Sequence, residues 1–182
     1  MPMKELELQK AFMLLEPGPV TMISTSHEGK HNLMTISWTM VMDFTPRFAL
    51  LTGSWNYSCE ALLKTKECVI GIATADLVDT ILDVGTTTGR KIDKFAQFGL
   101  TPLPASHVSA PLIKECYANI ECRVVDYIEQ HSIFVLDGVK AWIDEDRKEK
   151  RILHARGDGI FIADGEIFER REKMGDKLPP GV

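Results

Sequence analysis

The positions of hydrophobic and polar residues along the chain predict a β-rich domain with short helices between its strands. Within residues 1–17, Leu8, Phe12 and Leu15 recur at helical spacing over 4–15 and predict a short N-terminal helix. From residue 20 onward, alternating apolar positions and turn residues replace that spacing. The predicted strands cover 20–26, 32–42, 48–52, 68–74, 116–127, 131–143 and 159–168, the first two as a hairpin and the last folded back at Asp164-Gly165.

Three short helices are predicted between these strands, at residues 59–66, 77–84 and 91–98. Asp76 would cap the second helix, which Gly85 would end, and Gly99 would end the third. Residues 171–182 are predicted to be a loose tail. Strands joined by such short helices do not make a doubly wound parallel sheet, because that sheet needs a full crossover helix after nearly every strand. The pattern therefore predicts one domain over 1–182, built as an antiparallel barrel.

Composition and charge exclude several classes of protein. A chain of 182 residues has the length of one ordinary domain, and 45% hydrophobic with 8% aromatic residues excludes a disordered chain. The net charge of −5, without a dense basic run, makes nucleic acid a poor partner. The longest apolar runs fall far short of the ~20 residues that cross a bilayer. The first residues are acidic where a leader would be basic and apolar, so we expect a cytoplasmic protein.

Motif spacing argues against metal, nucleotide-fold and hydrolase chemistry. The four cysteines show no pair at the spacing of a zinc knuckle or redox dithiol, and Cys116 and Cys122 share the alternation of a buried strand face. Neither a glycine-rich dinucleotide fingerprint nor a phosphate-binding P-loop is present. The histidines have no metal-ligand spacing, and no nucleophile elbow is found. We nominate no catalytic acid, base or nucleophile and no metal ligand.

A strand with hydroxyls on one face is the first candidate for ligand chemistry. Over residues 32–40, alternation places Thr35, Ser37 and Thr39 on one face. The other face carries Met34, Ile36, Trp38 and Met40. The hydroxyl face either lines a groove for a polar ligand or simply meets water, because threonine is a common strand residue.

Two further segments could bind a phosphate. The turn Gly53-Ser54-Trp55-Asn56-Tyr57-Ser58 leads from a buried strand into a helix, whose free N–H groups attract anions. Alternatively, Asn56 or Ser58 only caps that helix. Residues 86–94 combine hydroxyls, a glycine and the cations Arg90, Lys91 and Lys94, which also suits a solvated surface loop.

An ordered set of short motifs resembles the flavin reductase-like FMN-binding split-barrel family, and most closely its flavoredoxin-like branch. The motifs are Gly18-Pro19-Val20, Asn32-Leu33-Met34-Thr35-Ile36-Ser37-Trp38, Thr45-Pro46-Arg47-Phe48, Tyr57-Ser58, Gly71-Ile72, Asp93-Lys94-Phe95 and Gly99-Leu100-Thr101-Pro102. The resemblance extends over about 20–145. It implies an antiparallel Greek-key split barrel, a homodimer and one noncovalent FMN near each barrel and the dimer interface. Electrons would pass from NADH or NADPH through the flavin to an acceptor.

The resemblance also implies a set of cofactor-binding residues. Asn32, Thr35 and Ser37 would meet the flavin ring or ribityl chain, and Ser54, Tyr57, Ser58 and Lys94 would surround the phosphate. The remaining members of the expected set are Met34, Ile36, Trp38, Thr39, Gly53, Thr88 and Lys91. If Lys94 holds the phosphate as a point charge, its loss should weaken FMN but not riboflavin. The alternatives are a non-enzymatic FMN electron carrier and a cofactor-free binding module on the same barrel.

Overall fold

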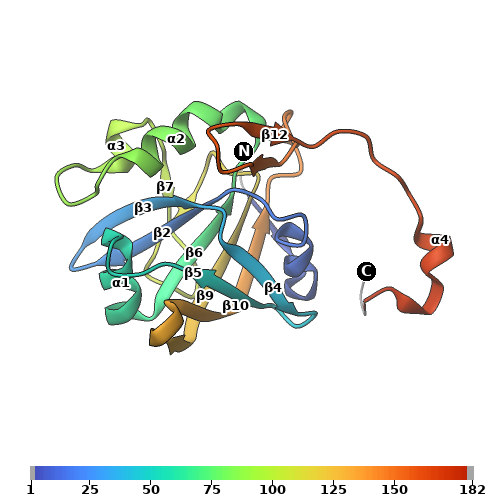
Figure 1. Ribbon diagram of the computed structural model, residues 1–182, viewed down its shortest axis with the longest axis horizontal. Helices are drawn as coiled ribbons and strands as arrows, with labels where there is room; N and C mark the ends of the chain where they lie inside the picture. The colour runs from blue at the N-terminus through green and yellow to red at the C-terminus, as the bar shows by residue number, and fades with distance from the viewer. Residues whose placement is uncertain (1–2, 180–182) are drawn as a thin grey trace.

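The computed structural model describes residues 3–179 and is built around one antiparallel eight-stranded sheet (Figure 1). The strands of this sheet are β1 (Lys4–Leu6), β2 (Thr21–His27), β3 (Lys30–Ile36), β4 (Thr39–Asp43), β5 (Arg47–Leu51), β6 (Glu67–Ile72), β9 (Ala118–Ile128) and β10 (Ile133–Ile143). They follow the order β3-β2-β6-β9-β10-β5-β4, and β1 pairs with β10. Strands β3 and β4 are therefore the two edges of this path, although they follow each other in the chain.

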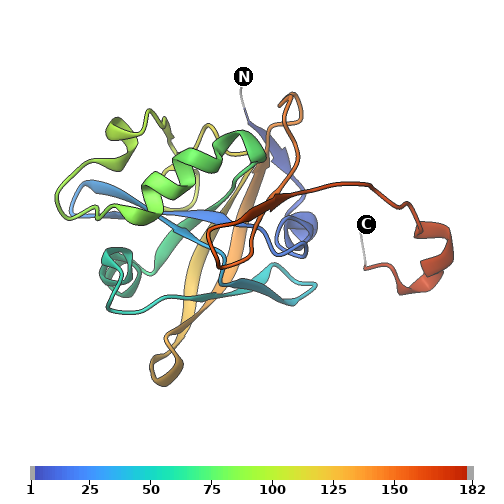
Figure 2. The same ribbon diagram turned by 45° about the horizontal axis from the view of Figure 1, so that its top comes forward.

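Short helices and two small sheets lie outside the barrel, and all but the C-terminal α4 and η4 lie close to it (Figures 1 and 2). The helices are α1 (Tyr57–Thr65), α2 (Val78–Thr86), α3 (Lys94–Gln97) and α4 (Arg171–Met174), with 3₁₀ turns η1 (Leu8–Leu14), η2 (Ala75–Leu77), η3 (Glu129–His131) and η4 (Gly175–Lys177). The small sheets pair β7 (Pro102–Leu103) with β8 (Leu112–Ile113), and β11 (Leu153–Ala155) with β12 (Phe161–Ala163). No helix within residues 3–179 is long and apolar enough to cross a membrane.

Two apolar clusters on opposite faces of the sheet hold the fold together. The barrel interior packs Ile23, Met34, Phe48, Ile70 and Phe134, while the outer cluster includes Met22, Leu33, Ile81, Val84 and Phe95. Met22 and Ile23 are neighbours on β2, and Leu33 and Met34 are neighbours on β3. Both faces of this hairpin are therefore buried, because α2 and α3 cover the side that points away from the barrel.

The structure departs from several predicted element boundaries. The N-terminal segment forms β1 and the 3₁₀ turn η1 instead of the helix predicted over 4–15, and residues 1–2 of the predicted N-terminal segment lie outside the described residues. Asp76 lies within η2 instead of capping α2, and Gly85 lies inside α2. The strand predicted over 32–42 is interrupted at residues 37–38, so its alternation does not continue from β3 into β4. Residues 159–168 do not fold back on themselves, because β12 pairs with β11.

Burial of the two cysteines is confirmed, but they do not share one face of β9: Cys122 lies in the barrel interior, whereas Cys116 precedes β9 and belongs to the outer cluster. The face of β9 opposite Cys122 is buried as well. Cys116 and Cys122 are fully buried, and so are Asn119 and Glu121. The Asn119 side chain bonds the backbone of Ile113 on β8, while the Glu121 carboxylate accepts hydrogen bonds from the Ser106 and His107 N–H groups and the Trp142 indole. The connection between α3 and β9 folds over this face, which no local pattern indicates.

Candidate functional site

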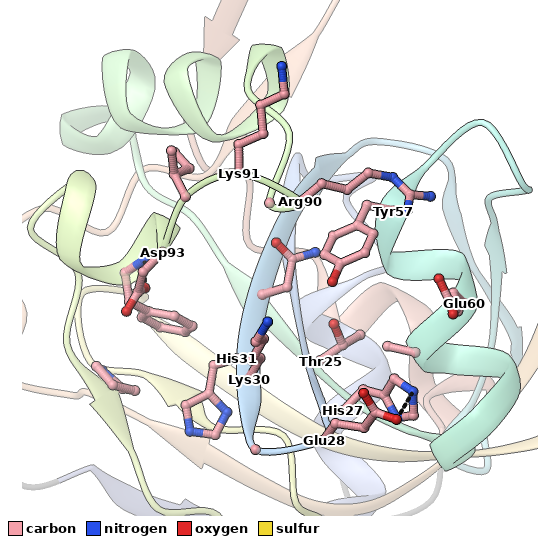
Figure 3. A pocket seen from close by; sticks show the side chains of 17 residues that line it. Thr25, His27, Glu28, Lys30, His31, Tyr57, Glu60, Arg90, Lys91 and Asp93 are labelled. Atoms are coloured by element: carbon pink, nitrogen blue, oxygen red, sulfur yellow. Dashed lines mark hydrogen bonds and ion pairs between the residues drawn. The ribbon is translucent and has the colours of Figure 1, made fainter.

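A cleft of about 520 Å³ opens beside the tip of the β2–β3 hairpin (Figure 3). Its walls are this hairpin, the first turns of α1 and the loop at residues 89–93. Three of the residues predicted to bind a cofactor line it, namely Asn32, Tyr57 and Lys91. The structure therefore brings the start of α1 and the cationic loop after α2, which are far apart in the sequence, to one cleft.

Buried polar atoms without partners are found in the wall formed by the hairpin. Asn32 is 8% exposed, and its Nδ2 donates to the Ser58 Oγ at 2.8 Å, but its Oδ1 has no hydrogen-bond partner. Thr25 stands opposite Asn32 in the β2–β3 register, and its buried Oγ1 also lacks a partner. A buried polar atom without a partner costs roughly 1–3 kcal/mol. These two atoms indicate that the cleft is built to receive hydrogen-bonding groups.

The loop at 89–93 closes tightly against Asn32. A Cβ built on Gly89 would collide with the Asn32 Oδ1, so only glycine lets the backbone approach this closely. The next residue, Arg90, extends across the ring of Tyr57, with its Cζ 4.7 Å from the ring centroid (Figure 3). This cation–π contact fixes a guanidinium at the rim of the cleft.

Charges of both signs surround the cleft, but the acids are set apart from the guanidinium. Figure 3 shows Arg90 at one end, with Glu28 close to His27 at the other. Glu60 lies on α1, below Tyr57 in this view. The Asp93 carboxylate caps α3 by accepting from the Phe95 and Ala96 N–H groups at 2.9 and 3.2 Å. The end of the cleft near Arg90 is therefore the part suited to an anion.

Lys94 does not carry out the role predicted for it. Its side chain is 4% exposed, and its Nζ donates to the Leu33 and Val84 carbonyl oxygens at 2.7 Å each. Burial lowers the pKa of this ammonium from 10.5 to about 8. Leu33 lies on the edge strand β3 and Val84 in the last turn of α2, where carbonyls lack partners within the helix. The lysine therefore joins helix to strand behind the cleft and does not present its charge there.

Comparison with known proteins establishes the family. The model of the flavin reductase like domain matches residues 13–159, which is well over half of the chain. The chain belongs to the flavin reductase-like family. An uncharacterized protein of Archaeoglobus fulgidus is 33% identical over 118 residues, which are 63% of this chain and 67% of that protein.

Two solved structures show the same fold. One is an FMN-binding domain of a flavin reductases-like enzyme from Shewanella baltica, with a TM-score of 0.87 and 23% identity over 93% of this chain and 98% of that chain. The other is the flavoredoxin of Desulfovibrio vulgaris, with a TM-score of 0.78 and 24% identity over 84% and 90% of the two chains. The predicted antiparallel split barrel is thereby confirmed.

Several side chains of the predicted cofactor-binding set point into the protein interior. Met34 is buried in the barrel interior and Ile36 packs against the same cluster. The Thr35 hydroxyl donates to the Ile81 carbonyl oxygen of α2 at 2.7 Å, and Ser58 is fully buried behind Asn32. None of these side chains lines the cleft, because packing covers both faces of β3, and their contact with a cofactor stays a prediction.

A second group of predicted residues lies where β3 passes into β4. Ser37 and Trp38 form this link, and the Trp38 carbonyl accepts from the Leu51 N–H at 3.0 Å. Thr39 Oγ1 is a third buried polar atom without a partner among the described residues. Nearby along the chain, Gly53 is covered by the ring of Trp55, which a Cβ at residue 53 would meet, and Ser54 is exposed. This group borders β5, and none of its members lines the cleft.

Two residues that line the cleft, Arg90 and Thr25, are missing from the predicted cofactor-binding set, whereas the predicted Thr88 does not line it. Thr88 is exposed, and its Oγ1 accepts from the Arg90 N–H at 3.4 Å. Arg90 belongs to the cationic segment 86–94, but nothing in the sequence shows that it packs on Tyr57, so the pattern does not single it out as a cofactor-binding residue. Thr25 could have been found from the hairpin register, which places it opposite Asn32.

Proposed function

We propose that this protein binds one FMN noncovalently per subunit and passes electrons from NADH or NADPH through the flavin to an acceptor. Membership of the flavin reductase-like family supports this proposal, as does the FMN-binding neighbour from Shewanella baltica. The observation that carries it is the cleft itself, which is lined both by Asn32, with its unpartnered Oδ1, and by Arg90, whose guanidinium packs on Tyr57.

The polar groups of the cleft fit the chemistry of FMN. The ribityl hydroxyls and a ring N–H can donate hydrogen bonds, and the Asn32 Oδ1 and Thr25 Oγ1 are buried oxygens that lack a donor. The phosphate needs cationic donors, and a guanidinium presents several N–H groups in a fork that matches phosphate oxygens. FMN is favoured over FAD because one terminal phosphate suits the single end of the cleft near Arg90.

In this proposal the protein binds and orients, while bound FMN supplies the hydride and electron transfer. Ser58 holds the Asn32 amide so that its oxygen faces the cleft. Tyr57 places Arg90 for the phosphate, and Gly89 brings the loop backbone up to the hairpin. Behind these residues, Lys94 fixes the distance between α2 and β3. Outside the cleft, the exposed side chains of Trp38, which precedes β4, and Trp55, which precedes α1, could meet the ring.

Titration with flavins tests the cofactor. Arg90→Met should weaken FMN by ~1.5–3 kcal/mol, the usual worth of a hydrogen bond to a charged group, or roughly tenfold to a hundredfold in dissociation constant. Riboflavin, which lacks the phosphate, should bind equally well to both proteins. Arg156→Met removes an exposed arginine outside the cleft and serves as the control. Protein that stays colourless after incubation with excess FMN and desalting, with no heat of binding, would contradict FMN binding.

Anaerobic mixing with each nicotinamide nucleotide tests the reaction. Loss of the yellow flavin absorbance with NADH or NADPH supports the reductase. If chemical reductants bleach the flavin but neither NADH nor NADPH does, the result supports the alternative of a non-enzymatic FMN electron carrier. Protein that never retains flavin supports the cofactor-free module.

We also propose a two-fold symmetric dimer. The apolar segments 48–51 and 133–136 are largely buried, with Phe48, Leu50, Phe134 and Leu136 in the barrel interior. Exposed apolar side chains lie instead on β4 and its flanks, where Trp38, Met40, Met42 and Phe44, here called the β4 strip, are 46–61% exposed. At about half exposure, four side chains of ~150–250 Å² each leave roughly 300–550 Å² of apolar surface in water, the size of a patch that often marks an interaction site.

A second copy that covers the β4 strip also covers an edge strand, whose unpaired backbone groups otherwise invite aggregation. Light scattering should give twice 20.4 kDa at micromolar concentration with FMN present, and a value of 20.4 kDa would contradict the dimer. All four cysteines are free thiols, as is usual in a reducing compartment. We therefore propose a cytoplasmic location.

A further inference from the structure

The segment after β12 leaves the body of the molecule. Figures 1 and 2 both show residues 165–178, here called the C-terminal arm, standing away from the barrel with α4 near its far end. Within the described residues 3–179, every hydrogen bond and ion pair of the arm has both partners in the arm. The arm is therefore held in place by nothing in its own barrel.

The arm carries apolar side chains that its own chain leaves in water. Ile167 is 91% exposed and Phe168 is 64% exposed, and Met174 on α4 is also exposed. The arm has four acidic and four basic residues, so its net charge is zero and the chain's overall charge of −5 does not repel it. A segment that served only as a soluble tail would lack such adjacent large apolar residues.

The barrel presents a matching apolar surface on the side of the molecule toward which the arm extends. In both views the outer end of β4 points to this side (Figures 1 and 2). The β4 strip runs along this strand and faces solvent. The arm does not cover the strip of its own chain.

We propose that the C-terminal arm of one chain packs through Ile167 and Phe168 on the β4 strip of a second copy, an arrangement that rests on the dimer proposed above. Residues 165–170 have no helix, so at ~3.3 Å per residue they span up to ~20 Å. This exceeds the ~16 Å radius of gyration expected for a domain of this length, so the arm can reach a neighbouring molecule. Two-fold symmetry makes the exchange reciprocal, with each arm on the other barrel.

Ile167→Glu tests this contact without risk to the fold, because the replaced side chain is almost fully exposed. Sedimentation over a concentration series should show that the dimer dissociation constant rises at least tenfold, since burial of a large apolar side chain is lost. The matched control is Leu63→Glu, which places the same charge at a partly exposed position on α1 and should leave dimerisation unchanged.

Trypsin gives an independent measurement, since the arm contains Arg170, Arg171, Lys173 and Lys177. Cleavage should be slow above the dissociation constant of the dimer and fast below it, and Met42→Glu on the β4 strip should make it fast at every concentration. A dimer whose arm is cut at one rate at all concentrations, and which tolerates Ile167→Glu, would overturn the exchange and leave the dimer standing. A monomer at all concentrations would overturn both.

Discussion

Replacement of Lys94 by methionine distinguishes a structural lysine from a phosphate-binding one. Methionine keeps a similar unbranched side chain but removes the ammonium that donates to the Leu33 and Val84 carbonyl oxygens. Because the site is 4% exposed, water cannot easily take over these hydrogen bonds. The variant therefore leaves two backbone acceptors buried without donors.

The expected loss of stability follows from two opposing effects. Two hydrogen bonds to a charged group are worth ~1.5–3 kcal/mol each. Against this, methionine removes the cost of burying an ammonium, the cost that lowers the pKa of Lys94 to about 8. We expect the free energy of unfolding to fall by a net ~2–3 kcal/mol at neutral pH, within the range of buried polar losses.

The pH dependence has a defined sign. The pKa of Lys94 is about 8 in the fold and 10.5 in the unfolded chain, so between these values the unfolded chain binds more protons. Stability of the wild type therefore gains a contribution as pH rises through this window, and Lys94→Met lacks it. The difference in unfolding free energy between the two proteins should widen between pH 8 and 10.5.

Urea unfolding at several pH values measures this difference, with Lys91→Met as the control for an exposed lysine of the same segment. Flavin titration adds a second readout: the variant should lose affinity for FMN and riboflavin equally, because Lys94 positions the loop and does not meet the phosphate. Unchanged stability, or a loss confined to FMN, would refute this reasoning and restore the point-charge role.

Three further expectations follow from burial and close contact. All four thiols should resist a disulfide reagent until the chain unfolds, because they are buried and burial raises the pKa of Cys116. A thiol that reacts rapidly in the native protein would contradict this expectation. Gly89→Ala should weaken FMN at least ~10-fold by displacing the loop from the hairpin, whereas Gly165→Ala, which has open space around it, should not. Glu121→Gln should lower the free energy of unfolding by ~1–3 kcal/mol, because the amide NH₂ group cannot accept a hydrogen bond and so cannot replace both carboxylate oxygens that bind the Ser106 N–H, the His107 N–H and the Trp142 indole. Urea unfolding measures this loss, and an unchanged midpoint would contradict it.

The class of fold could be predicted from the residue pattern, because a strand with one apolar side shows a period of two in its sequence. The strands at 48–52, 116–127 and 131–143 agree with β5, β9 and β10 within a few residues. The turn at residues 53–56 does lead into α1, and Asn56 caps it as the simpler alternative proposed. Local spacing and capping chemistry suffice for such features, since their causes lie within a few residues.

What each polar side chain faces depends on how distant elements of the chain pack against one another, which the residue pattern does not show. Thr35 and Lys94 looked available for a ligand because the sequence does not show that α2 and α3 cover the outer face of β3. Asn32, Tyr57 and Arg90 come from three separate segments, and their meeting depends on packing between elements. Alternation along one strand cannot tell a face that meets water from a face that meets another helix, because both accept the same residues until a distant part of the chain covers one of them.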